Sequence, residues 1–195
     1  MVQIRPSLKS NILKTFDDYL AQAEGWEPRC ELTNGELIEM PPESDENVII
    51  ARILDRALSD LVGFRRVRTH QLAIEMMGQP KNRFPDVTVL QPEHPDQLKA
   101  SGQSAIRLDM APPLLVVEVV SPGPDNHRRD YIDKRNQYEW LGIPEYWIVD
   151  PILKQVTVLV LAEEGYEEMV FTGQAHVQSM VLPGWSLTAE DMLTP

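Results

Sequence analysis

The feature that most constrains the fold is a short valine-rich segment at residues 114–120, LLVVEVV, with one acidic residue inside it. Six of its seven residues are apolar and four are valine, a composition typical of a β-strand buried on both faces. An ionised carboxylate in such a strand is costly unless a metal ion, a cation or hydrogen bonds compensate its charge. Glu118 therefore marks a candidate functional site. The structural alternative is that Glu118 lies near the strand end and pairs with an arginine.

Size and composition indicate a globular protein in a reducing compartment. The 195 residues allow a proper core, and the hydrophobic (43%) and charged (25%) fractions are ordinary. No apolar run approaches the roughly 20 residues that span a bilayer, and the N-terminus has no signal-peptide pattern, so no membrane partner is expected. A single cysteine, Cys30, excludes an internal disulfide and favours the cytoplasm. The four histidines lack zinc-site spacing and are expected to be surface or core residues (His70, His94, His127, His176).

The charge of the chain is unevenly distributed. A net charge of −12 argues against a nucleic-acid partner, because binding phosphates requires cations. Residues 63–138 are the exception, with 11 basic and 9 acidic residues. This basic region is either an ordinary solvated charged face or one side of a nucleic-acid site.

Helix and strand patterns alternate along the chain. A helix is expected from about Thr15, a hairpin at 30–40 with an Asn34-Gly35 turn, and a longer helix from Ser44 or Asp45 to about residue 61. Strands are expected at 65–77, 87–90, 114–120 and 146–149, a helix at about 125–141, and a hairpin at 155–171. Residues 92–113 are expected to form a long loop, with at most one weak helical turn. These elements predict an α/β or α+β fold, with helices on both faces of a central mixed sheet.

Three features of the predicted fold converge on one place. Asp86 begins one strand and Glu118 lies in the next strand along the chain, and consecutive strands are often neighbours, so the two carboxylates can share a hard cation. Asp130, Lys134 and Tyr138 follow at a spacing that puts them on nearly one helix face. If that face packs on the sheet, Lys134 reaches Glu118. The alternative for Asp130 and Lys134 is a surface ion pair worth a few tenths of a kcal/mol.

Several motifs together resemble the Uma-two family of bacterial proteins. They are residues 34–40 (NGELIEM), 85–87 (PDV), 117–122 (VEVVSP) and 142–151 (GIPEYWIVDP), with Asp130, Lys134 and Tyr138 between the last two. The resemblance implies a restriction endonuclease-like fold of the PD-(D/E)XK nuclease superfamily. It implies one such domain over residues 1–195, with the core at about 29–151 and residues 152–195 as a C-terminal hairpin extension.

The resemblance also assigns roles to particular residues. Asp86 and Glu118 match the two metal-binding acids, and Val119 matches the residue that offers its backbone carbonyl to Mg²⁺ or Mn²⁺. The lysine of the simple superfamily pattern falls on Val120, whereas Lys134 matches the place of a lysine that has moved to the following helix. The position that is usually histidine in the family is Asn47 here. Possible accessory residues are two acids (Glu36, Glu46) and Tyr138. Apart from the resemblance, Arg128 and Arg129 follow a loop just past Glu118 that either guides a phosphate backbone into the site or is an ordinary connecting loop.

The function implied is a Mg²⁺-dependent endonuclease that hydrolyses phosphodiester bonds of DNA, with a homodimer expected from the family. Metal-held acids and a nearby lysine suit this chemistry, because the attacking water must be activated and the charge of the transition state offset. Two alternatives remain. One is a non-catalytic module that binds nucleic acid or protein and retains the nuclease fold, and the other is a metal-dependent hydrolase of another phosphoester.

Overall fold

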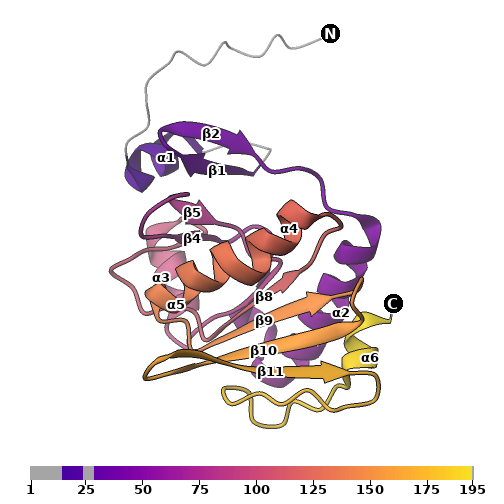
Figure 1. The fold of residues 1–195 in the computed structure, drawn as a ribbon. Coiled ribbons are helices and arrows are strands. Elements are labelled where there is room, and N and C mark those ends of the chain that lie inside the picture. The colour runs from indigo at the N-terminus through magenta and orange to yellow at the C-terminus, as the bar shows by residue number, and fades with distance from the viewer. Residues whose placement is uncertain (1–14, 24–28, 195) are drawn as a thin grey trace, which may run out of the picture.

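The structure is a computed structural model that describes residues 15–23 and 29–194 (Figure 1). The helices are α1 (Phe16–Ala23), α2 (Asp45–Val62), α3 (His94–Ser101), α4 (Pro124–Arg128), α5 (Arg135–Leu141) and α6 (Ala189–Leu193). A 3-10 turn, η1 (Phe64–Arg66), follows α2, and a π-helical segment, η2 (Arg129–Lys134), joins α4 to α5. In the described part of the chain, no helix is both long and apolar enough to cross a membrane.

The strands form one large sheet and two small ones. They are β1 (Cys30–Thr33), β2 (Glu36–Glu39), β3 (Val67–Thr69), β4 (Ala73–Glu75), β5 (Asn82–Arg83), β6 (Val87–Val89), β7 (Ala105–Ile106), β8 (Leu115–Val119), β9 (Glu145–Asp150), β10 (Gln155–Ala162) and β11 (Gly165–Thr172). The six-stranded sheet has the order β11-β10-β9-β8-β6-β3, in which only β8 and β9 are parallel neighbours. The expected mixed central sheet is therefore confirmed.

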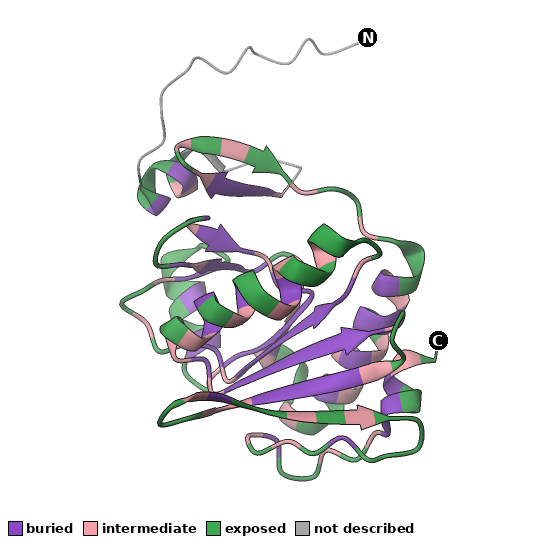
Figure 2. Cartoon of the chain, viewed as in Figure 1, coloured by how far each residue is buried: buried purple, intermediate pink, exposed green. Residues whose placement is uncertain are grey.

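Helices cover both faces of this sheet (Figure 1). On one face α2 and α6 pack their apolar residues, among them Ile50 and Met192, against inward-facing residues of β8 such as Val117. On the other face Tyr138 of α5 packs against Val116 and its neighbours. Strands β8 and β9 are buried along their whole length, as the purple strands in Figure 2 show. The valine-rich segment thus lies at the centre of a three-layer arrangement, as its sequence predicts.

Local signals account for the elements that carry site residues. Asn34 and Gly35 both have positive φ (52° and 87°), as a two-residue hairpin turn requires, and this turn joins β1 to β2. Ser44 caps α2, because its side chain accepts a hydrogen bond from the backbone N–H of Asn47 at 3.1 Å. The C-terminal hairpin of β10 and β11 is also confirmed.

Two expected segments differ in the structure. The single strand expected at 65–77 is wrong: it breaks at His70, whose φ is 53°, so that β3 joins the large sheet and β4 a different one. The long loop expected at 92–113 is also wrong, because it contains α3 and β7. Helix α3 has few apolar residues, but it buries His94 and Leu98 and ends at Gly102 in the left-handed conformation. Tertiary burial of this narrow face outweighs the weak helix signal of the sequence.

Candidate active site

The centre of the site is an ion pair between the strand β8 and the helix that follows it. Lys134 Nζ lies 2.7 Å from Glu118 Oε2 and 2.8 Å from Asp130 Oδ1. The exposed fractions of the three residues are 2% for Glu118, 4% for Lys134 and 0% for Asp130. The contact between Asp130 and Lys134 is therefore not a surface ion pair. It is one half of a buried bridge in which the lysine joins two carboxylates.

Tyr138 completes the contacts of Glu118. Its hydroxyl donates to Glu118 Oε1 at 2.6 Å, so that both oxygens of this carboxylate have a partner. Asp130 and Lys134 belong to the π-helical segment η2, and the hydroxyl of Tyr146 donates to the backbone carbonyl of Asp130 at 2.9 Å. A π-helical turn adds one residue to the helix and is frequent at functional sites. Here the segment carries both Asp130 and the lysine that meets the strand.

Asp86 lies beside this ion pair on the neighbouring strand. Its Oδ2 accepts a hydrogen bond from the backbone N–H of Val119 at 2.6 Å, and its exposed fraction is 5%. Strands β6 and β8 are antiparallel with Val87 opposite Val117. Continuing this register by one residue brings Asp86 opposite Glu118, on the same face of the sheet. The two acids expected to share a cation thus lie side by side at the same end of these two adjacent strands.

Asn47 holds the end of β8 from the other layer. Its side-chain amide donates to the carbonyl of Val119 at 3.2 Å and to the hydroxyl of Ser121 at 3.0 Å. Asn47 is almost fully buried at 1% exposure. A carbonyl oxygen has two lone pairs, so the oxygen of Val119 retains one for a further partner. Asn47 therefore hydrogen-bonds to the backbone carbonyl of Val119, the group that the family resemblance assigns to the metal.

Two residues that the sequence reasoning missed lie next to Asp86. One possible ligand atom from each of Glu43, His70 and Asp86 lies within 4.8 Å of the other two, and we call these residues the Glu43–His70–Asp86 cluster. Glu36 and Glu46, the expected accessory acids, are exposed on β2 and α2, and neither belongs to the cluster. The signals for the cluster are weak in sequence. Glu43 directly follows two prolines, and His70 lies where the strand pattern breaks.

Burial and neighbouring charges determine the ionisation of the central pair. Burial raises the pKa of Glu118 to about 7, Lys134 opposes this rise, and Asp86 and Asp130 add to it. Burial acts to lower the pKa of Lys134, but Glu118 and Asp130 outweigh it and hold the pKa above its ordinary value. The lysine therefore stays a cation. It offsets the charge of two buried carboxylates.

The pKa values of Asp86 and Glu43 are shifted in opposite directions, although burial acts to raise both. Burial acts to raise the pKa of Asp86, but His70, Lys134 and the N–H of Val119 together lower it below its ordinary value. Burial raises the pKa of Glu43, and the negative charge of Asp86 adds to the rise. Asp86 is thus an ionised acceptor at neutral pH. The negative charges of Asp86 and Glu43 repel each other, and a cation bound between them would reduce this repulsion.

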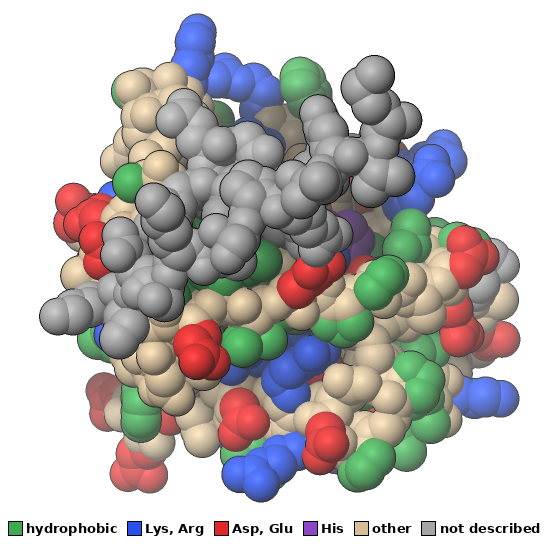
Figure 3. Space-filling view, turned by 90° about the horizontal axis from the view of Figure 1, so that it is seen from above, with side chains coloured by type: hydrophobic (Ala, Val, Ile, Leu, Met, Phe, Trp, Pro, Cys, Tyr) green, Lys and Arg blue, Asp and Glu red, His purple; other side chains and the backbone are tan. Residues whose placement is uncertain are grey.

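The two arginines expected to contact phosphate lie in different surroundings. Arg128 is exposed on α4, and its nearest ion-pair partner, Asp133, is 4.0 Å away. Arg129 turns toward Asp130, with its Nε 3.4 Å from Oδ1. On the face shown in Figure 3, basic and acidic side chains are interspersed among the coloured residues rather than gathered into one positive surface. Arg128 is therefore the better placed of the two for a solvent-borne phosphate.

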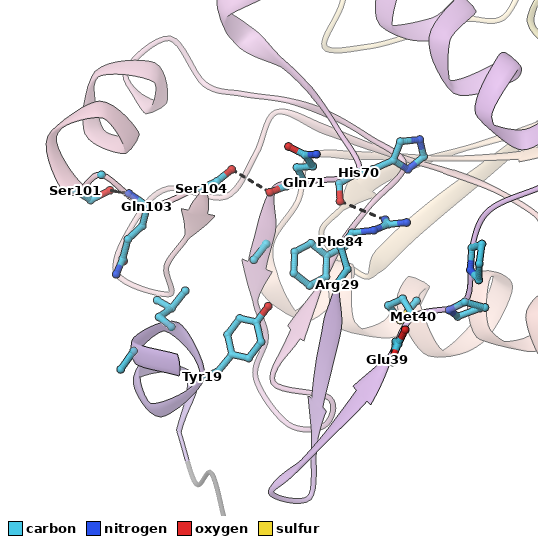
Figure 4. Close-up of a pocket in the computed structure, with 16 residues that line it drawn as sticks. Tyr19, Arg29, Glu39, Met40, His70, Gln71, Phe84, Ser101, Gln103 and Ser104 are labelled. Carbon is cyan, nitrogen blue, oxygen red and sulfur yellow. Dashed lines mark hydrogen bonds between the residues drawn. The ribbon is translucent and has the colours of Figure 1, made fainter. Parts of the chain in front are cut away.

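A cavity of about 880 Å³ opens beside His70. Its lining residues come from α1, from the end of β2 and the residues that follow it, from β4, and from the end of α3. Figure 4 shows Tyr19, Phe84 and Arg29 among its lining residues, with the Arg29 guanidinium donating to the carbonyl of His70 at 3.2 Å. Its lining also includes the polar side chains of Gln71, Ser101, Gln103 and Ser104. His70 is the member of the Glu43–His70–Asp86 cluster that belongs to the lining of this cavity.

A sequence profile of the family described as "Putative restriction endonuclease" (Uma-two) matches residues 16–190. The chain belongs to the Uma-two family. No curated protein matches this Uma-two protein. It is similar in fold to a solved structure titled as a "putative nuclease belonging to DUF820" from Anabaena variabilis ATCC 29413, with a TM-score of 0.66 and 17% sequence identity. The alignment covers 93% of this chain and 98% of that one, so the likeness extends over nearly the whole fold.

Proposed function

We propose that this Uma-two protein is a divalent-metal-dependent endonuclease that hydrolyses phosphodiester bonds of DNA. The observation that carries the proposal is the buried contact between Lys134 and Glu118, beside Asp86 on the adjoining strand. These three residues match the acids and the lysine of the nuclease superfamily. Asp86 is linked to the strand of Glu118 by the hydrogen bond that it accepts from the backbone N–H of Val119.

The residues present suit Mg²⁺ or Mn²⁺. Asp86, Glu118 and the carbonyl of Val119 offer oxygen ligands, which hard divalent cations prefer. Carboxylates also outnumber basic side chains around the site. The carboxylates are those of Glu43, Asp86, Glu118 and Asp130, and the basic side chains are those of Arg29, Arg129 and Lys134. A divalent ion offsets the remaining negative charge. When bound, such an ion lowers the pKa of a water molecule and offsets charge on the phosphate.

Each residue of the chain has a separate task in this proposal. Lys134, kept protonated by Glu118 and Asp130, places a positive charge where negative charge develops on the phosphate. Tyr138 holds Glu118 in one orientation through its hydroxyl. Asn47 fixes the carbonyl of Val119, and Arg128 contacts the backbone of the incoming DNA from α4.

One observation favours the alternative of a non-catalytic binding module. Glu118 and Lys134 are almost fully buried and satisfy each other's charges, as a structural ion pair does. Binding of DNA without hydrolysis requires no access of water to this pair. The two functions therefore differ in a measurable way: only the nuclease depends on the charges of Glu118 and Lys134 for turnover.

The test is cleavage of supercoiled plasmid in the presence of Mg²⁺ or Mn²⁺. We expect nicking by the wild-type protein, its loss with EDTA, and a fall of at least about 100-fold in Glu118→Gln and Lys134→Met. Lys99→Met is the control for Lys134→Met, because Lys99 is exposed on α3 and belongs to neither proposed cation position. Cleavage that persists in Glu118→Gln contradicts the proposal. Binding without cleavage, unchanged in Glu118→Gln, supports the binding module.

A further inference from the structure

The Asp86 carboxylate is shared between two groups of residues. Its Oδ2 accepts the hydrogen bond from Val119 on β8, whereas its Oδ1 lies 3.3 Å from Nδ1 of His70. On the His70 side, ligand atoms of Glu43, His70 and Asp86 all lie within 4.8 Å of one another. This is close to the separation of ligands across one divalent ion, for which bonds of about 2.0–2.3 Å are usual.

The backbone holds His70 beside Asp86. The N–H of His70 donates to the carbonyl of Asp86 at 3.2 Å, and its own carbonyl accepts from Arg29. Its φ of 53° lies in the left-handed region, where histidine is one of the more tolerated residues. The imidazole is therefore placed next to the carboxylate before any ligand binds. Its side chain retains 22% exposure, and the residue is one of those that line the cavity of Figure 4.

The side chains of Glu43, His70 and Asp86 do not provide every polar atom of the cluster with a hydrogen-bond partner. Nδ1 of His70 is shielded from solvent, and its 3.3 Å contact with Asp86 lacks the alignment of a hydrogen bond. Glu43 is partly buried, and its carboxylate lies close to the negative charge of Asp86. Arg29 offsets this charge only in part, since its Nη2 is 3.5 Å from Glu43 Oε1. A bound cation would give Nδ1 of His70 a partner and would offset the neighbouring charges of Glu43 and Asp86.

We propose that Glu43, His70 and Asp86 form a second divalent-cation site, separate from the position between Asp86 and Glu118. The imidazole nitrogen makes this site select a first-row transition metal ion such as Mn²⁺ or Zn²⁺ over Mg²⁺, which prefers oxygen ligands alone. This site goes beyond the proposed nuclease function, because an inactive protein can bind the ion as well. The two proposals share only Asp86.

The test is pulsed electron paramagnetic resonance of Mn²⁺ bound to the full-length protein. We expect a nitrogen hyperfine coupling from directly bound His70 and a much weaker competition by Mg²⁺. His70→Asn removes the imidazole but tolerates the positive φ, so it should lose the coupling and bind Mn²⁺ about tenfold or more weakly. Glu43→Gln should weaken binding in the same direction. His127→Asn is the control, because His127 is exposed on α4 and should leave both measurements unchanged.

Glu118→Gln separates this site from the proposed catalytic position. It should abolish plasmid cleavage yet leave the nitrogen coupling in place, because Glu118 is not a ligand of the second ion. An inactive wild-type protein that still shows the coupling refutes the nuclease and not this site. Absence of nitrogen coupling in the folded wild-type protein overturns the proposal. So does a coupling that persists in His70→Asn.

Discussion

Lys134 Nζ lies 2.7 Å from Glu118 Oε2, although the lysine belongs to a helical segment and the glutamate to a central strand. In the simple superfamily pattern the lysine stands two residues after this glutamate, at the position of Val120. Val120 is 1% exposed in the apolar cluster around Tyr138. A lysine there would have to bury its ammonium among apolar side chains. The helix instead supplies the amine from η2, where Glu118 and Asp130 both compensate it.

The first prediction concerns the stability that Lys134 provides. Lys134→Met leaves Glu118 buried without its cation and Asp130 with Arg129 alone, and breaking such a buried pair costs about 3–5 kcal/mol. We therefore expect the free energy of unfolding, measured in urea, to fall by about that amount. Lys99→Met, on the exposed side of α3, should change it by less than about 0.5 kcal/mol. Equal stabilities for the two variants would show that the pair is not buried as described.

The second prediction concerns Asn47, which stands where the family pattern has histidine. Asn47→Ala removes the donor to the buried Val119 carbonyl and to the half-buried Ser121 hydroxyl. We expect a loss of about 1–3 kcal/mol in unfolding free energy, seen as a lower melting temperature. Asn136→Ala is the control, since Asn136 is exposed on α5. An unchanged melting temperature in Asn47→Ala contradicts this role.

The third prediction concerns a buried acid far from the cation sites. Glu145 on β9 accepts hydrogen bonds from Trp147 Nε1 and Ser179 Oγ at 2.6 Å and from the backbone N–H of Met180 at 2.8 Å. All three partners are donors, so Glu145→Gln places an amide donor among them. Hydrogen exchange at the Met180 amide should become faster, because the segment loses its attachment to the sheet. Glu190→Gln, exposed on α6, should leave that exchange rate unchanged.

The fourth prediction is a pH dependence that originates at His94. Burial lowers the pKa of His94, although Glu93 opposes this. In the unfolded chain a histidine has a pKa of about 6.5, so the unfolded state binds the proton first as the pH falls. The stability from the neutral buried ring is present above about pH 6.5 and decreases below it. Unfolding free energies at about pH 7.5 and 5.5 should differ more in the wild-type protein than in His94→Asn. An equal difference would rule out His94 as the source.

The sequence predicts those parts of the fold that depend on short-range patterns. The Asn34-Gly35 turn, the cap at Ser44 and the apolar run around Glu118 each act within a few residues, and the structure has the elements that they indicate. The contact between Lys134 and Glu118 follows from the helix period and the order of elements. It also requires the π-helical turn, for which the sequence has no clear signal.

The Glu43–His70–Asp86 cluster could not be predicted in this way. It depends on a break in the strand pattern at His70 and on the path of the residues before α2, and both are set by tertiary packing. The separation of the four histidines along the chain says nothing about a site that takes one histidine and two acids from distant segments. Glu46 follows Glu43 by less than one helical turn, yet it is exposed on α2. Neighbouring acids in sequence are therefore poor guides to the ligand set.

The most direct test of the whole account is anomalous scattering from crystals of the protein grown with Mn²⁺. We predict a manganese ion within about 2.0–2.6 Å of a carboxylate oxygen of Asp86, because both proposed cation positions use this residue. Glu118 and the Val119 carbonyl as further ligands would mark the nuclease position, and Glu43 with His70 would mark the second site. Manganese bound only at places that do not touch Asp86 would contradict the account.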